Sequence, residues 1–401
     1  MLENTLLLAI TTIVLFVLFQ PHLKQSSYWR ATVTPLASII GSGFLVAAPL
    51  LSQAVNSWAL FAMTAIVVFA YAIGSVIRYN IRYAEPLLYN GLTSTWLLAV
   101  ERLASLVLCI AYVISIAFYL RLMASFILKT FEIESDFLAN IITTAVLIFI
   151  ATIGWWRGLT GLESLEETAV NIKLSIIAAL LIGLAWFDIS WLNQTGNELI
   201  YHPIEDWTYS LQLLAGVLLI IQGFETSRYL GAQYDADTRI SSMRFAQILS
   251  AIIYLLFIAL ALPLLGDLNG RSGETAIIEL SGIVASILPA MLIIAAVMSQ
   301  FSAAIADTAG SGGLLSELSP RIAPKRGYLA VIALAIIIIW SASIFEIIAI
   351  ASRAFALYYL LQCIVALLVA RGQGHFIQQL GFSVIAGILL LVVIFAIPDG
   401  G

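Results

Sequence analysis

The stretch that decides the fold is residues 34–51, TPLASIIGSGFLVAAPLL, an apolar segment of membrane length with Gly41-Ser42-Gly43 at its centre. A helix inside a bilayer must satisfy its own backbone groups, because hydrocarbon offers them no partners. Two glycines around a serine, with Pro49 close behind, favour a helix that opens at mid-membrane and presents free N–H and C=O groups to something polar. The alternative interpretation is that the small residues only allow close packing between helices.

The composition indicates a membrane protein with many spans. Of the 401 residues, 62% are hydrophobic and 10% are charged, and the mean hydropathy is +1.04. A soluble globular chain is much more polar than this. The apolar runs come in blocks of about 20 residues, the length that an α-helix needs to cross a bilayer. We therefore expect an all-α integral membrane protein in contact with lipid, without a soluble domain and without a nucleic-acid partner.

About twelve apolar blocks follow one another along the chain. Their approximate limits are 2–19, 34–51, 57–77, 95–128, 137–156, 166–187, 208–230, 243–265, 280–309, 327–343, 346–370 and 378–397. Lys and Arg collect in the cytoplasmic loops of membrane proteins. If the linker after the first block is cytoplasmic, the basic residues inside are Lys24, Arg30, Arg78, Arg82, Arg157, Arg228, Arg239, Arg244, Arg321, Lys325, Arg326 and Arg371, and those outside are Arg121, Lys129 and Arg271. This bias predicts both termini outside, and we expect the bacterial inner membrane.

A long acidic loop divides the predicted helices into two sets of five. The predicted units are an extra helix with a basic linker (1–30), a first repeat (31–187), a second repeat (208–371) and a C-terminal helix (372–401). Because five is an odd number, the two repeats have opposite orientations in the membrane. The second repeat also opens with an interrupted apolar run, at Gln222-Gly223-Phe224-Glu225. Interrupted helices at corresponding places in two inverted halves are typical of a transporter's substrate site.

In these features the chain resembles the amino acid–polyamine–organocation (APC) superfamily, which has the inverted five-plus-five fold of LeuT. The matching motifs are Ile40–Phe44 in the first core helix, Gly158–Gly161 with Asn171-Ile172-Lys173 in the fifth, Gly223–Glu225 with Asp235–Arg239 in the sixth, and Ser299–Ser302 with 313–325 in the eighth. The resemblance covers about 31–371. The Gly-rich turn that many amino acid permeases have between the second and third core helices is absent, and Leu219 stands where some members carry an aromatic gate.

The resemblance implies a secondary transporter of a small amino acid or related amine, driven by protons or by exchange, with broken first and sixth core helices. It implies substrate-binding roles for Ile40, Gly41, Ser42, Gly43, Leu219, Gly223 and Phe224, and coupling or gating roles for Lys173, Glu225, Ser299, Ser302 and Asp307. We expect no cofactor, no metal and no enzymatic activity, because His22, His202 and His375 all fall in predicted loops. The alternatives are sodium coupling, which Ser299 and Ser302 would serve, and a non-transporting sensor or subunit on the same scaffold. The oligomeric state stays open.

Three ionisable residues inside apolar blocks are the sharpest candidates, because charges in hydrocarbon are costly and usually functional. Glu225 is either a gate beside the sixth-helix break or the partner of Arg228 three residues on. The Lys173 ammonium either extends back to the cytoplasmic surface or fills the place of a sodium ion between the first and eighth core helices. Asp307 either takes part in coupling or forms an ion pair with Lys173 or Arg353.

Overall fold

The computed structural model describes residues 2–41, 43–91, 94–133, 135–195, 204, 206–217, 221–265, 276–319, 323–341 and 344–395. Its helices are α1 (Leu2–Leu18), α2 (Pro21–Gln25), α3 (Ser27–Ile39), α4 (Gly43–Val55), α5 (Ala59–Tyr79), α6 (Glu85–Tyr89), α7 (Thr95–Thr130), α8 (Asp136–Thr195), α9 (Trp207–Val217), α10 (Ala236–Leu265), α11 (Ala276–Val284), α12 (Leu288–Leu318), α13 (Pro324–Ser341), α14 (Ile344–Gln373) and α15 (Phe376–Phe395), with the short segments η1 (Asn56–Trp58), η2 (Asn80–Ala84) and η4 (Phe224–Leu230). These described residues form no strand. The predicted all-α class is confirmed.

Eight stretches of the described chain are helical, apolar and long enough to cross a bilayer. Two of them contain more than one helix. Ser27–Tyr89 runs from α3 through α6, and Asp136–Ser190 is bent at Gly158, whose φ of 63° and ψ of −152° lie outside the helical range. Large apolar side chains such as Phe16 and Phe61 are exposed on the outside of the bundle, as lipid contact requires. The chain is an integral membrane protein, and the total of twelve spans stays a prediction.

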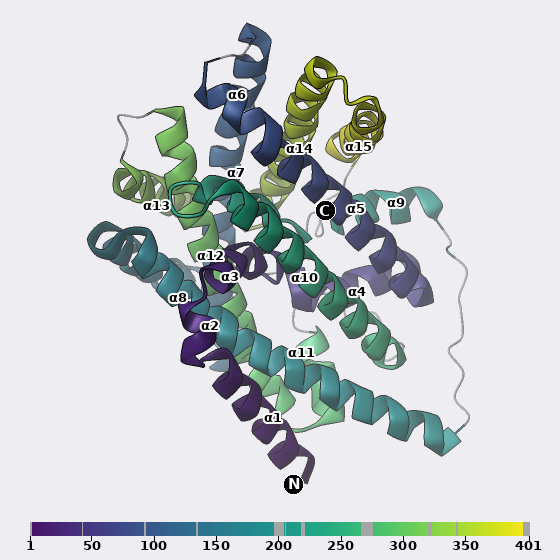
Figure 1. Cartoon of the computed structure of the whole chain (residues 1–401). Helices are drawn as coiled ribbons and strands as arrows, with labels where there is room; N and C mark the ends of the chain where they lie inside the picture. Colours follow the sequence, from purple (N-terminus) through teal and green to yellow (C-terminus); the bar gives the residue numbers. More distant parts are fainter. Residues whose placement is uncertain are drawn as a thin grey trace.

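Helix α12 occupies the interior of the bundle, where it packs against α3, α7, α8 and η4 (Figure 1). Its small residues make this possible, because they let a neighbouring helix approach closely. A Cβ added at Gly313 would lie 2.1 Å from the carbonyl oxygen of Tyr229 in η4. Helix α1 lies along α8, and α15 packs on α14, so both terminal helices border the bundle rather than form its centre.

The helix is interrupted at both of the places that the sequence predicts. Between α3 and α4, Ile40 has φ −88° and ψ 54°, which ends the helical run. Between α9 and η4, Gly223 has φ +107°, a conformation that is strained for any residue with a Cβ. Side chains from α7, α8, α10, α12 and α14 surround the two breaks, and this is where the candidate site lies.

Candidate functional site

The first break exposes the carbonyl groups at the end of α3, which no longer have helical donors. Side chains from three other helices supply the missing donors. The Tyr254 hydroxyl donates to the Ile39 oxygen at 3.0 Å, and the Ser299 hydroxyl donates to the Ile40 oxygen at 3.2 Å. Gly41 is needed here because a Cβ at its position would lie 2.6 Å from the Ser38 carbonyl oxygen.

Lys173 of α8 supplies the third set of donors, and it reaches the break from a fully buried position. Its Nζ donates to the carbonyl oxygens of Ala37 at 2.8 Å and Ile40 at 2.5 Å, and to the Ser302 hydroxyl at 2.9 Å. The ammonium therefore connects the first interrupted helix to α12 through three neutral oxygens. The alternative in which Lys173 extends back to the cytoplasmic surface is wrong.

The two serines of α12 both belong to this arrangement. Ser299 contacts the Ile40 carbonyl, and the Ser302 hydroxyl donates to the Ser299 carbonyl at 3.1 Å while it accepts from Lys173. Both side chains are buried. Carbonyl and hydroxyl oxygens are the ligands that bind hard cations in proteins, and here the lysine ammonium lies among them.

Glu225 lies at the second break and is fully buried. One of its carboxylate oxygens accepts from the Gly223 N–H at 3.0 Å and from the Tyr359 hydroxyl at 2.5 Å, and the other accepts from the Tyr112 hydroxyl at 3.4 Å. Phe224 stacks on the Tyr359 ring, with centroids 5.3 Å apart. The alternative ion pair between Glu225 and Arg228 is wrong, because Arg228 has other partners.

The two breaks touch each other through Ser38. A Cβ at Gly223 would lie 2.1 Å from the Ser38 hydroxyl oxygen, so the second break packs directly on α3. The same hydroxyl donates to the Asp307 carboxylate of α12 at 3.3 Å, and the Ser115 hydroxyl of α7 donates to its other oxygen. Asp307 is thus held by two neutral hydroxyls. The predicted ion pairs of Asp307 with Lys173 or Arg353 are wrong.

Two of the residues implied by the resemblance, Ser42 and Leu219, lie outside the described residues. Except for Gly43, the structure brings the others together in two groups. Ile40, Gly41, Lys173, Ser299 and Ser302 meet at the first break, and Gly223, Phe224, Glu225 and Asp307 meet around the second. Gly43 is buried as the first residue of α4. No cluster of His, Cys, Asp or Glu suited to a metal ion occurs in the described part of the chain.

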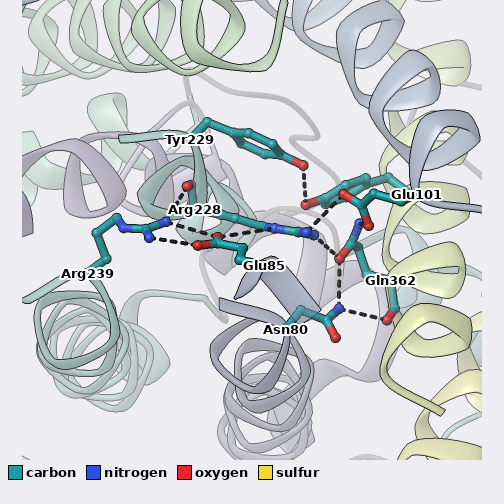
Figure 2. A network of polar contacts seen from close by, with 8 residues as sticks. Asn80, Glu85, Glu101, Arg228, Tyr229, Arg239 and Gln362 are labelled. Atoms are coloured by element: carbon teal, nitrogen blue, oxygen red, sulfur yellow. Dashed lines mark hydrogen bonds and ion pairs between the residues drawn. The ribbon is translucent and has the colours of Figure 1, made fainter. Parts of the chain in front are cut away.

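A second polar network lies at the far end of η4 (Figure 2). Arg228, which is 2% exposed as a side chain, forms ion pairs with Glu101 of α7 at 2.9 Å and with Glu85 of α6 at 3.6 Å. Arg239 of α10 binds both oxygens of Glu85, at 3.0 and 2.7 Å, and also the Arg228 carbonyl. Gln362 of α14 contacts Arg228 and Glu101. Two cations and two carboxylates balance, so these four charges are paired within the protein.

The sequence did not indicate that the residues of this network lie together. Glu85 lies in the loop after the apolar block 57–77, and Glu101 lies within the apolar block 95–128. Gln362 and Asn80, which donates to Gln362 at 2.8 Å, read as isolated polar residues. The only available signal was that each is a polar side chain in an apolar helix. The network ties together α6, α7, α10, α14 and η4, and thereby fixes one end of the second interrupted helix.

The fold and the site define a class: a helical membrane protein in which two interrupted helices face each other around buried polar groups. The chain belongs to the APC superfamily of transporters, because a family model described as an APC superfamily transporter matches residues 21–396. A protein of Aquifex aeolicus (strain VF5), described as uncharacterized, is 43% identical over 392 residues, which cover 96% of this chain and 95% of that protein. The predicted family is confirmed.

Solved structures show the same fold at low sequence identity. A Na⁺-coupled sialic acid symporter in a substrate-bound outward-open state matches with a TM-score of 0.55 and 14% identity over 99% of this chain and 98% of its own. Two variants of the manganese transporter of Eremococcus coleocola match with TM-scores of 0.57 and 13% identity, over 92% of this chain and 87% and 88% of theirs. The predicted LeuT-like fold is confirmed, and the protein is a membrane transporter for a small-molecule substrate.

Proposed function

We propose that the protein is a secondary active transporter of a small amino acid or related amine, works by alternating access, and is coupled to protons or acts as an exchanger. The single observation that carries this proposal is the position of Lys173, whose ammonium lies on the carbonyls of Ala37 and Ile40 and on the Ser302 hydroxyl. A bound sodium ion would need this kind of oxygen cage. The lysine provides the cation itself, and unlike sodium it can gain or lose its charge with a proton.

The neutral surroundings of Lys173 suit such a change of charge. Its three acceptors are carbonyl and hydroxyl oxygens, so loss of the proton from Lys173 leaves no charged acceptor without its cation. Because two of these acceptors end α3 and the third belongs to α12, the proton on Lys173 would bias how firmly α3 is held against α12. A two-state helix position that responds to a proton is what coupling by alternating access needs.

For the substrate, we propose a molecule with an amino group, and a carboxylate if it is an amino acid. The amino group would lie near Gly223, where the carbonyl oxygen already accepts from the Thr226 hydroxyl at 2.6 Å, and near Glu225. A carboxylate would meet the start of α4 at Gly41–Gly43, because the first N–H groups of a helix have no partner within the helix. Leu219 and Phe224 would line the same space. No cofactor, metal or chemical conversion of the substrate takes part in this scheme.

Sodium coupling is the second candidate, because Ser299 and Ser302 are hydroxyl ligands of the right kind and a structural neighbour is a Na⁺-coupled symporter. Here, however, the Ser302 hydroxyl contacts Lys173, and the Ser299 hydroxyl donates to Ile40.

We place the protein in the bacterial inner membrane with both termini outside, an orientation that rests on the distribution of Lys and Arg in the loops.

The experiment is uptake into proteoliposomes, with solutes first selected by a thermal-shift screen of amino acids and amines on the purified protein. We expect accumulation to follow an inward proton gradient, or a counter-solute, and not a sodium gradient. Lys173→Met should abolish accumulation driven by the proton gradient while solute exchange continues, and Lys325→Met, at the exposed start of α13, is the matched control. Glu225→Gln should change the pH profile of uptake. Sodium-dependent uptake that persists in Lys173→Ala would overturn the proposal.

A further inference from the structure

Helix α8 carries two buried carboxyl groups on the same face as Lys173. Glu163, Glu166 and Lys173 are spaced by three and seven residues, which places them on one side of an α-helix. Glu163 is 5% exposed, and Glu166 and Lys173 are fully buried. Glu166 and Lys173 also interact electrostatically. Burial of ionisable groups in a membrane protein costs free energy. Such groups therefore usually pair with one another or form a path for ions or protons.

The contacts of α3 follow the same order as these groups along α8. The Thr34 hydroxyl donates to Glu166 at 3.1 Å, and the Ala37 carbonyl one turn further on accepts from Lys173. Arg30, one turn before Thr34, interacts with Glu163. The two helices thus run side by side in the same direction. Along α8, Glu163 is farthest from the first break, Glu166 comes next, and Lys173 lies at the break.

Each carboxyl has one oxygen that is buried and receives no hydrogen bond from the described residues: Oε2 of Glu163 and Oε1 of Glu166. Such an oxygen can bind a proton, because protonation removes a buried negative charge that lacks hydrogen-bond donors. The charged groups that act on Glu166 are Glu163 on its own helix, Lys173 at the break and Asp307 of α12. Thr34 is its neutral contact. Glu166 therefore has a free oxygen and a cation on the side of the break.

The other end of this series leads away from the break toward the basic linker. Glu163 accepts from the Tyr234 hydroxyl at 3.0 Å and interacts with Arg30, Glu167 and Tyr328 of α13. Glu167 in turn interacts with the exposed Lys24 of α2 and with Arg30. By the distribution of basic residues this is the cytoplasmic end of the helix. The series Lys173, Glu166 and Glu163 thus runs from the first break to the cytoplasmic side.

We propose that Glu166 and Glu163 form the cytoplasmic proton route of Lys173, an inference that rests on the coupling role proposed above. A proton leaves the Lys173 ammonium and binds the Glu166 carboxylate, so that a charged pair becomes a neutral amine and a neutral carboxyl. It then passes to Glu163 and to cytoplasmic water, and Glu166 is again a carboxylate. Only N–H and O–H bonds form and break. Each transfer needs direct contact or one bridging water, as proton transfer between side chains generally does.

The exchange of the Lys173 ammonium hydrogens with deuterated water tests this route without a substrate. The chain has four lysines, Lys24, Lys129, Lys173 and Lys325, so nitrogen-15 labelling of lysine side chains gives few NMR signals, and Lys173→Met assigns the one at the break. We expect Glu166→Gln to slow exchange at Lys173 by about tenfold or more. Glu3→Gln, at an exposed carboxyl in the first turn of α1, is the control and should leave the rate unchanged.

The direction of the effect separates a proton route from a structural role. A substitution that only loosens the packing would speed up exchange, whereas loss of the route slows it. If Glu166→Gln does not fold, Glu163→Gln breaks the next step and should also slow exchange. An unchanged or faster rate in the folded variants would overturn the route. If the NMR signal of Lys173 stays that of an ammonium at every pH from about 5 to 10, the coupling role of Lys173 itself would be overturned.

Discussion

The two helix breaks are stabilised by side chains of opposite type, a basic one at the first and an acidic one at the second. At the first, the carbonyl oxygens of Ala37 and Ile40 receive hydrogen bonds from the Lys173 ammonium. At the second, the N–H of Gly223 donates to the Glu225 carboxylate. A broken helix exposes carbonyl groups on one side of the break and N–H groups on the other. Here a lysine donates to the exposed carbonyls, and a glutamate accepts from an exposed N–H. Each break is therefore satisfied from within the protein.

The partners of the charged side chains differ between the two breaks and the arginine network. The hydrogen-bond partners of Lys173 at the first break are all neutral, and so are those of Glu225 at the second, which are two tyrosine hydroxyls and a backbone N–H. By contrast, Arg228 and Arg239 face carboxylates directly. A change of charge leaves an unpaired ion in the arginine network but not at the breaks. The breaks are therefore the places where the proposed coupling would act, whereas the network holds helices in place.

The largest expected effect comes from Gly223→Ala. The positive φ of +107° strains any residue with a Cβ, and that Cβ would lie 2.1 Å from the Ser38 hydroxyl oxygen. Strain and overlap together should lower the free energy of unfolding by about 3 kcal/mol or more. Unfolding in mixed detergent micelles measures this change. Gly91→Ala, at φ +66° with no atom within 4 Å of the added Cβ, is the control for strain without overlap.

A further variant identifies the source of the effect. Ser38→Gly should relieve most of the overlap in the double variant with Gly223→Ala, because the two positions are in contact and their effects are therefore not additive. If Gly91→Ala costs as much as Gly223→Ala, the second break is strained but does not depend on contact with the first.

A pair of tyrosine variants tests whether the second break really holds an anion. Tyr359→Phe removes the 2.5 Å hydrogen bond to Glu225, and Tyr254→Phe removes the 3.0 Å bond to the Ile39 carbonyl. Loss of a donor to a charged acceptor should cost about 1.5–3 kcal/mol, whereas a neutral bond between membrane helices averages about 0.6 kcal/mol. The same unfolding measurement compares them. Equal costs would mean that Glu225 is neutral in the folded protein.

The breaks themselves could be predicted from the sequence because their signal is local. Glycines in the middle of an apolar run stand out without knowledge of any other part of the chain, and Gly41 and Gly223 indeed lie at the two interruptions. Lys173 could be placed between the first and eighth core helices only through the family resemblance. Its contacts with Ala37 and Ser302 agree with that placement, while its role stays a prediction.

The partners of the charged residues could not be predicted, because they come from distant segments. Tyr359 lies 134 residues from Glu225, and Tyr112 lies 113 residues away. In an apolar run, a tyrosine looks like any other core aromatic. The expected pair of Glu225 with Arg228 follows a rule for helix surfaces, where water is the alternative partner. Inside the bundle both residues have tertiary partners, so this rule does not apply.

The smallest expected effect concerns a carboxylate that binds helix N–H groups in water. Asp235 precedes α10 and accepts from the backbone N–H of Thr238 at 2.7 Å and from its hydroxyl at 3.2 Å. These bonds hold the pKa of the exposed Asp235 carboxyl below its usual value. A lowered pKa stabilises the fold above the usual value of about 4, and this contribution disappears as the pH falls through the lowered value.

Thermal unfolding between about pH 2 and 6 should therefore show a slightly steeper loss of stability on acidification in the wild type than in Asp235→Asn, whose amide keeps an oxygen acceptor but does not titrate. The difference should be small, because solvent already stabilises an exposed carboxylate. Glu225 accepts from a backbone N–H in the same way, yet it is fully buried and has no water to replace that bond. If Asp235→Asn changed the acid profile as strongly as Glu225→Gln, burial would not be what distinguishes the second break from an ordinary helix start.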